Sequence, residues 1–212
     1  MKILAISDEV DPLVYSSNIK NRYGDIDLVL SCGDLPFNYY DFIVSSLNVP
    51  LFYVLGNHPP PLQPSRELCW MANDPPGCVN LDDKVIRYKN LIIGGFEGSI
   101  RYNNDQWSKQ YSNFEMSNKI RRTAPRLLFN KLFRGRALDI LATHAPPLGI
   151  HDREDPCHRG FKPFLRYMRR YKPKYLIHGH VHLYDRNETW RSRYLDTEVI
   201  NAYGVRVLEI DD

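Results

Sequence analysis

Six short apolar runs recur along the chain, and each has the length of one buried strand. Their continuous apolar character, rich in β-branched residues, is typical of strands covered on both faces, as in α/β proteins. The segment FNYYDFIVSSL at 37–47 lies between the second and third runs and is long enough for a helix, which predicts a βαβ unit. The six runs occupy residues 2–7, 27–32, 51–55, 91–95, 138–143 and 174–179.

The remaining segments have different patterns. Residues 119–136 and 159–174 mix apolar and basic positions and predict helices before the last two of these strands. Residues 188–210 alternate more strictly, which predicts antiparallel strands with a turn near Gly204. Residues 59–83, rich in Pro, Gly and Asn, predict a loop with a short helix around 65–72. No repeat or linker divides the chain, so we expect one domain over residues 1–212.

Composition narrows the class of protein. The chain is 43% hydrophobic and 25% charged, as globular domains are. No apolar run approaches the ~20 residues of a membrane span, and the opening MKILAISDEV is too short an apolar run for a signal peptide. The four cysteines show no CxxC spacing, so we expect reduced thiols in a cytoplasmic protein rather than disulfides or a zinc cage; they are Cys32, Cys69, Cys78 and Cys157.

The charge is unevenly distributed. The formal net charge is only +3, yet residues 119–136 and 159–174 together carry 14 of the 28 basic side chains and no acid. These stretches are either solvated helix faces balanced by acidic loops elsewhere, or a positive rim that attracts an anionic substrate such as nucleic acid.

Polar residues that can bind a metal follow five of the predicted strands. A single such residue after a strand ordinarily caps a helix or forms a turn. Capping and turns do not explain why five strand ends all carry a carboxylate, a carboxamide or an imidazole. Since ligands bind at the carboxyl ends of strands in open α/β sheets, these side chains are expected to converge. They are Asp8, Asp34, Asn57, His58, His144, His180 and His182.

Their order resembles the signature of the calcineurin-like metallophosphoesterases, which is D-x-H, GD, GNH, a lone His and GHxH. The matching segments here are Asp8-Glu9-Val10, Gly33-Asp34, Gly56-Asn57-His58, His144 and Gly179-His180-Val181-His182. The resemblance covers about residues 3–185. THAPPLGIHD and KPKYLIHGHVH are similar to the small phosphodiesterase branch that includes the brain metallophosphodiesterases. The implied fold is a four-layer α/β sandwich, two packed mixed β-sheets flanked by helices.

The resemblance also implies a site. Two divalent transition-metal ions would neutralise the phosphoester and deliver a metal-bound hydroxide in line with the leaving group. Asp34 would bridge the ions, Asp8 and His182 would bind one of them, and the other would be bound by Asn57, His144 and His180. His58 would stabilise the transition state or protonate the leaving oxygen, whereas His178 would not be a ligand. Nitrogen and oxygen ligands suit Mn, Fe, Zn, Ni or Co.

One motif departs from the family pattern. Val10 stands where the family has the histidine of D-x-H, so the first metal site lacks an imidazole. Glu9 would point the other way if the strand continued, and Asp11 is a candidate replacement ligand if the loop bends. The expectation is a weakened first site or a single-metal enzyme.

The residues that would contact substrate are less defined. The loop 145–160 follows His144 and offers His158 and Arg159 as candidate substrate-binding residues. Arg101 or Tyr102 are further candidates. The aromatic residues of 37–40 either stack on a base or form the buried side of a helix.

Three functions remain open. The favoured one is a metal-dependent phosphoesterase, with a phosphodiester favoured over a phosphomonoester and a nucleotide-like substrate. A nuclease would explain the basic stretches. A non-catalytic scaffold, as in the retromer subunit of this superfamily, would explain Val10, but a scaffold has no need of the remaining metal-binding side chains.

Overall fold

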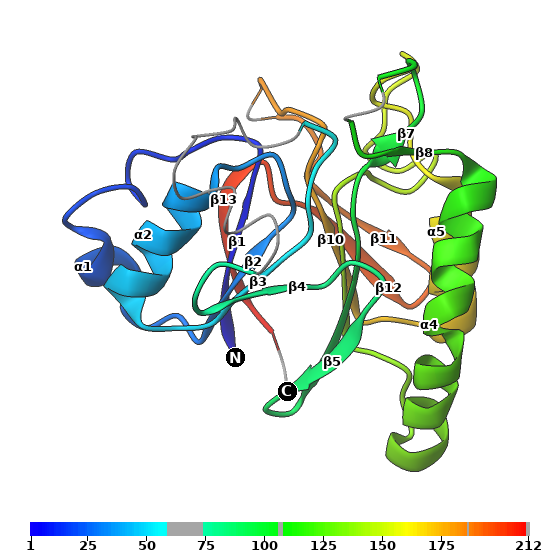
Figure 1. Ribbon diagram of the computed structural model, residues 1–212, viewed down its shortest axis with the longest axis horizontal. Coiled ribbons are helices and arrows are strands. Elements are labelled where there is room, and N and C mark those ends of the chain that lie inside the picture. The colour runs from blue at the N-terminus through cyan, green and yellow to red at the C-terminus, as the bar shows by residue number, and fades with distance from the viewer. Residues whose placement is uncertain (59–73, 106–107, 186, 211–212) are drawn as a thin grey trace.

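A computed structural model describes residues 1–58, 74–105, 108–185 and 187–210. Two large sheets pack face to face between two layers of helices, with α1 and α2 on one side and α4 and α5 on the other (Figure 1). The expected four-layer α/β sandwich with two mixed sheets is therefore confirmed.

The first sheet has five strands in the order β13-β1-β2-β3-β4. Strands β1 to β4 are parallel, and β13 lies antiparallel to β1 at one edge. The helix α2 (Phe37–Leu47) connects β2 to β3, as the apolar pattern predicts, and the short helix α1 is Ile19–Tyr23. The strands are β1 Lys2–Ser7, β2 Leu28–Ser31, β3 Leu51–Tyr53, β4 Cys78–Asn80 and β13 Gly204–Glu209.

The second sheet has six strands in the order β11-β12-β10-β9-β6-β5. Its inner strands β12, β10, β9 and β6 are parallel, and both edge strands are antiparallel to their neighbours. The strands are β5 Val85–Tyr88, β6 Leu91–Phe96, β9 Ile140–Thr143, β10 Tyr175–His178, β11 Arg191–Tyr194 and β12 Thr197–Asn201. A two-stranded ribbon of β7 (Ser99–Ile100) and β8 (Gln110–Tyr111) stands apart from it.

The core consists of three apolar layers because successive side chains of a strand point to opposite faces. In β1, Ile3 and Ala5 pack between the two sheets, while Leu4 and Ile6 pack beneath α1 and α2. The third layer lies between the second sheet and the helices α4 (Asn113–Arg134) and α5 (Lys162–Tyr171). Burial on both faces explains why the strands appear in the sequence as unbroken apolar runs.

Several boundaries differ from the sequence-based expectation. Helix α4 begins six residues before the basic stretch, because Ser112 and Glu115 form a capping box there. The turn near Gly204 joins no hairpin: β12 and β13 lie in different sheets. The expected loop at 59–83 contains the strand β4, and the helix expected around 65–72 lies outside the described residues. Within the described ranges, no helix has the length and apolar character needed to cross a bilayer.

Candidate metal centre

The strand ends of both sheets meet at one cavity of about 460 Å³. The first sheet contributes the residues after β1, β2 and β3, and the second sheet contributes those after β10, with His144 after β9 lying behind them. The cavity is lined by Asp8, Asp34, Asn57, His58, Tyr102, Cys157, His158, His180 and His182.

The backbone is strained where these side chains enter the cavity. Asp8, Asp34 and His180 have φ values of 65°, 55° and 68°, a left-handed conformation that non-glycine residues rarely adopt. Gly56 makes room for this arrangement, since a Cβ there would overlap the Asp34 carboxylate. Such strain is typical of functional sites, where the surrounding structure holds it in place.

His144 lies fully buried between the carboxylate and the amide of the centre. Its Nδ1 is 2.7 Å from the carbonyl oxygen of Cys32, which as an acceptor requires the proton on Nδ1. Its Nε2 therefore faces the side-chain oxygen of Asn57 at 2.9 Å and Oδ2 of Asp34 at 3.4 Å. A carboxylate, a carboxamide oxygen and an imidazole nitrogen thus converge on one point.

His180 is oriented in the same way. Its Nε2 donates to the carbonyl oxygen of Cys157 at 2.6 Å, so Nδ1 is left unprotonated and can bind a cation. The ring lies 4.7 Å from that of His144 between centroids. Ligand atoms of Asp34, His144 and His180 all lie within 4.8 Å of one another.

Asp8 and His182 line the same cavity beside these donors. Oδ2 of Asp8 accepts the amide N–H of His180, but Oδ1 is buried and has no hydrogen-bond partner among the described residues. Nε2 of His182 lies 3.9 Å from that Oδ1, and its ring stacks on Tyr203. An unpartnered buried carboxylate oxygen is costly unless a cation or water binds it.

The pKa values reflect this crowding. Burial raises the pKa of Asp8. For Asp34, burial acts in the same direction, but the charge and hydrogen bond of His144 outweigh it and hold the pKa below its usual range. For His144, burial alone would lower the pKa, and the nearby Asp34 and Asp8 raise it to about 9. The two carboxyl groups and His144 therefore shift one another's pKa values, as expected of charged groups that share one buried site.

The donor set fits divalent cations. Oδ2 of Asp34 faces His144, and Oδ1 accepts the amide N–H of His58. The Asn57, His144 and His180 atoms complete one half, and the Asp8 Oδ1 with the His182 Nε2 forms the other. The absence of thiolate from these six side chains suits transition metals that accept imidazole and carboxylate ligands.

The structure does not bring Val10 or Asp11 to this cavity. Val10 is exposed, and Asp11 caps a turn in which its Oδ1 accepts the amides of Leu13 and Val14 at 2.7 and 3.2 Å. The charge of Asp11 acts on the pKa of Tyr39, which belongs to α2. The half-site of Asp8 and His182 therefore gains no carboxylate from Asp11.

The two candidate substrate-binding residues are separated. His158 lines the cavity, whereas Arg159 lines a neighbouring hollow next to Arg153 and Asp152. His178 faces away from the cavity, with its Nε2 3.0 Å from Nδ1 of His151.

Of the remaining candidates for substrate contact, one lines the cavity and the others lie elsewhere. Tyr102 lines the cavity and accepts the side-chain amide of Asn57, while Arg101 pairs with Glu115 of α4. Tyr39 and Tyr40 are buried in the layer beneath α2, so the base-stacking alternative for them is excluded.

Sequence reasoning missed Cys157 and Tyr203. Cys157 holds His180 through its backbone carbonyl, which no side-chain pattern encodes. Tyr203 comes from the C-terminal part of the chain, after the motifs, and reaches the site because β13 returns beside β1. Among the described cysteines, Cys32, Cys78 and Cys157 are all free thiols.

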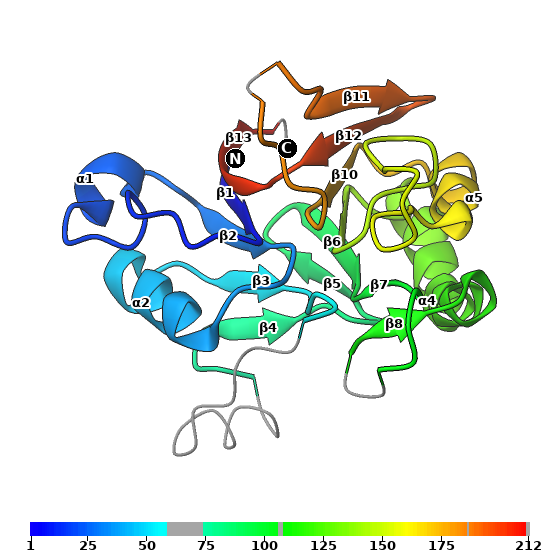
Figure 2. The same ribbon diagram turned by 90° about the horizontal axis from the view of Figure 1, so that it is seen from above.

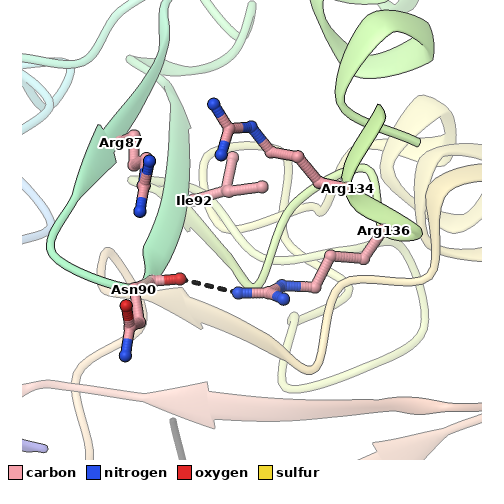
Figure 3. A pocket seen from close by; sticks show the side chains of 5 residues that line it. All are labelled: Arg87, Asn90, Ile92, Arg134 and Arg136. Carbon is pink, nitrogen blue, oxygen red and sulfur yellow. Dashed lines mark hydrogen bonds between the residues drawn. The ribbon is translucent and has the colours of Figure 1, made fainter. Parts of the chain in front are cut away.

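Two basic side chains at the end of the first stretch lie at the other end of the molecule from the cavity. Arg134 and Arg136, at the end of α4, line a hollow of about 290 Å³ with Arg87, near the start of β6 (Figure 3). Arg136 donates to the carbonyl oxygen of Asn90 and pairs with the buried Asp139. Since β6 runs from this hollow toward the cavity end of the sheet, these arginines do not form a rim around the cavity.

Comparison with known proteins agrees with this geometry. A family model described as "Calcineurin-like phosphoesterase" matches residues 1–184. The crystal structure of TT1561 from Thermus thermophilus is similar at 11% identity and a TM-score of 0.60, covering 96% of this chain and 89% of that one. A Vps29 mutant from Entamoeba histolytica is similar at 16% identity and a TM-score of 0.47, covering 100% and 87%. An archaeal phosphodiesterase has 14% identity and a TM-score of 0.42, covering 96% and 84%. No curated protein sequence matches the chain.

Proposed function

We propose, since the chain belongs to the calcineurin-like phosphoesterase family, that it is a phosphodiesterase with two divalent metal ions and a nucleotide-like substrate. The proposal places it near the small branch that includes the brain metallophosphodiesterases, on the motifs THAPPLGIHD and KPKYLIHGHVH. We propose a cytoplasmic location, from the free thiols Cys32, Cys78 and Cys157.

The observation that carries this proposal is the position of Asp34. Its two carboxylate oxygens lie in the same cavity as both groups of nitrogen and oxygen donors, and the unpartnered Oδ1 of Asp8 lies in the second group. We assign Asn57, His144 and His180 to one ion, Asp8 and His182 to the other, and Asp34 to both. When bound, the ions neutralise the phosphoryl oxygens and lower the pKa of water.

The protein side chains around the ions have separate tasks. The carbonyl oxygens of Cys32 and Cys157 fix the tautomers of His144 and His180, so the free nitrogen of each ring points into the centre. His58 is exposed, and among the described residues its hydrogen bond is made by its backbone amide to Asp34, so its imidazole is available to a phosphoryl or leaving-group oxygen. We propose that His58 stabilises the transition state or gives the leaving oxygen its proton.

Aromatic faces beside the cavity support a nucleotide-like substrate. Tyr102 and His158 line the cavity, and Tyr184 is 76% exposed with its hydroxyl 3.2 Å from Nδ1 of His182. Bases stack on such faces without sequence preference. A nuclease is less well supported, because Arg134 and Arg136 of the first basic stretch lie at the opposite end of the strands from the cavity. A non-catalytic scaffold would not explain why Asp8 is buried with its Oδ1 lacking a hydrogen-bond partner among the described residues.

The test combines metal analysis with hydrolysis of bis-p-nitrophenyl phosphate and p-nitrophenyl phosphate in added Mn²⁺. We expect bound metal and faster cleavage of the diester. Asp34→Asn should lose most of the metal and the activity while keeping the circular-dichroism spectrum, since an amide of similar size replaces the carboxylate. A variant that keeps wild-type turnover and metal content would refute the two-metal proposal, and cleavage of single-stranded DNA alone would favour a nuclease.

A further inference from the structure

A second group of potential ligands lies beside the candidate metal centre, on the loop between β9 and α5. Oδ1 of Asp155 is 2.7 Å from Sγ of Cys157 and 2.8 Å from Nδ1 of His158, and the sulfur is 3.3 Å from that nitrogen. A carboxylate, a thiol and an imidazole therefore share one point, and none of the three is assigned to the centre formed by Asp34 and its neighbours.

The loop that presents these side chains is held from several sides. Asp152 accepts the amide N–H groups of Gly149 and Gly160, and the amide of Arg153 donates to the carbonyl of His158. The Arg153 guanidinium also donates to the carbonyl of His182 at 2.7 Å. Hydrogen bonds of this kind, made around the ligand-binding side chains, hold the backbone of a binding site in place before a ligand binds.

The three side chains offer one oxygen, one sulfur and one nitrogen atom, with no pair of these atoms more than 3.3 Å apart. Thiolate and imidazole donors suit zinc-type cations, so the donor set favours such a cation over magnesium or calcium.

We propose that Asp155, Cys157 and His158 bind one thiophilic divalent cation of the zinc type, separate from the dinuclear centre. Zn²⁺ accepts sulfur, nitrogen and oxygen donors, and three protein ligands with an open fourth position are typical of its catalytic sites. The donor atoms of a tetrahedral zinc site lie about 3.3–3.7 Å apart, so the Asp155 oxygen must move outward slightly. The Asp155 and His158 side chains are 43% and 32% exposed, so solvent leaves room for this adjustment.

The cation would lie against the dinuclear centre. The His158 ring is 5.3 Å from the His180 ring between centroids, and the Cys157 carbonyl accepts the His180 Nε2 proton. Binding at the loop would therefore fix both the imidazole that lines the cavity and the carbonyl that orients a metal ligand. Sequence spacing gave no sign of this site, because the cysteines form no pair and the three ligands come from one four-residue turn.

The test uses Cd²⁺ as the probe, because a cadmium–thiolate bond has an ultraviolet charge-transfer absorption and the dinuclear centre has no thiolate. Full-length protein, stripped with a chelator, is titrated with Cd²⁺. We expect the thiolate band in the wild type, its loss in Cys157→Ser, and its retention in Cys78→Ser, a matched control at a buried thiol of β4. Asp155→Asn and His158→Ala should weaken the band-forming affinity by more than about tenfold, the lower range for a lost metal-site interaction.

The outcomes separate this site from the proposed function. Asp34→Asn should lose metal from the dinuclear centre and keep the thiolate band, so failure of one proposal leaves the other standing. No thiolate band in the wild type, or a band that persists in Cys157→Ser, overturns the proposed site.

Discussion

The amide N–H of His180 donates a 2.9 Å hydrogen bond to Oδ2 of Asp8, a residue 172 positions earlier in the chain. These two residues follow β10 of the second sheet and β1 of the first, so the sheets contact each other at the centre of the candidate site. Gly179 makes the contact feasible, because a Cβ at that position would overlap Oγ of Ser7 and Oδ2 of Asp8.

Gly179→Ala should therefore damage the metal centre more than the fold. The added methyl group forces the two sheet ends apart, so we expect metal loss, most of all from the Asp8 and His182 half, and a lower melting temperature. Gly135→Ala is the control: at φ +74° with nothing within 4 Å of the new Cβ, it should cost about 1 kcal/mol from backbone strain and leave metal content unchanged. Equal metal content in both variants would contradict the close-contact argument.

His58→Ala should separate catalysis from metal binding. Because only the backbone amide of His58 contacts Asp34, removal of the imidazole should leave metal content unchanged and lower kcat by about 10²–10⁴-fold if it acts as a general acid. Steady-state kinetics and elemental analysis of the same sample test this. Loss of metal on this substitution would show that the imidazole is a ligand.

Val10→His tests whether the loop after β1 can supply the missing imidazole. The Asp8 and His182 half lacks the family's imidazole, and a lost ligand should weaken metal binding by more than the ~10–100-fold typical of groups that only support a ligand, so the unmodified protein should hold fewer than two metals per chain. Because Val10 is exposed and does not line the cavity, Val10→His should shift activation by Mn²⁺ to lower concentration only if the loop turns position 10 toward Asp8.

Asp11→Ala is the companion variant. Since Asp11 accepts the amides of Leu13 and Val14, its loss should cost about 1 kcal/mol of stability and no metal. Two tightly bound metals in the unmodified protein, with one released by Asp11→Ala, would make Asp11 the replacement ligand instead.

His151 should make stability depend on pH in the acid range. Burial lowers its pKa to about 4, below the value of about 6.5 expected in the unfolded chain. The neutral imidazole therefore contributes stability that is complete above pH ~6.5 and is lost as the pH falls toward ~4. Urea midpoints measured across this range should fall less steeply in His151→Gln, which retains polar contacts to His178 and Ser192 without titrating. If the urea midpoints of the wild type and of His151→Gln fell equally steeply with pH, His151 would not be buried as a neutral group.

Most of the strands and helix α2 could be predicted from the sequence, because a strand buried on both faces appears as an unbroken apolar run. The apolar runs gave β1, β6, β9 and β10 nearly to their ends, and α2 occupies the residues expected of it. The strands β4 and β5 were not predicted, because they are short and their side chains are only partly buried.

The site was predictable where a motif residue follows a strand and unpredictable where a neighbour acts through its backbone. Asp34, His144 and His180 converge as expected from their strand ends. The carbonyl groups of Cys32 and Cys157, which orient two imidazoles, could belong to any residue type and leave no mark in the sequence. The position of Asp11 could not be predicted either, because it depends on a turn after β1 that no motif in residues 8–14 indicates.

The position of β1 between β2 and β13 has a consequence for how the chain folds (Figure 2). The amino group of Met1 donates to the carbonyl oxygen of Ile210 across 209 residues, and β13 pairs with β1 on the same edge, so β1 is synthesised long before its partner strand. Contacts of such long sequence separation slow folding, because the loop must close before any pairing energy is gained. During synthesis, β1 keeps this edge open, and Asp8 lacks its contact with His180 until residues near His180 have been made, so the candidate centre assembles late.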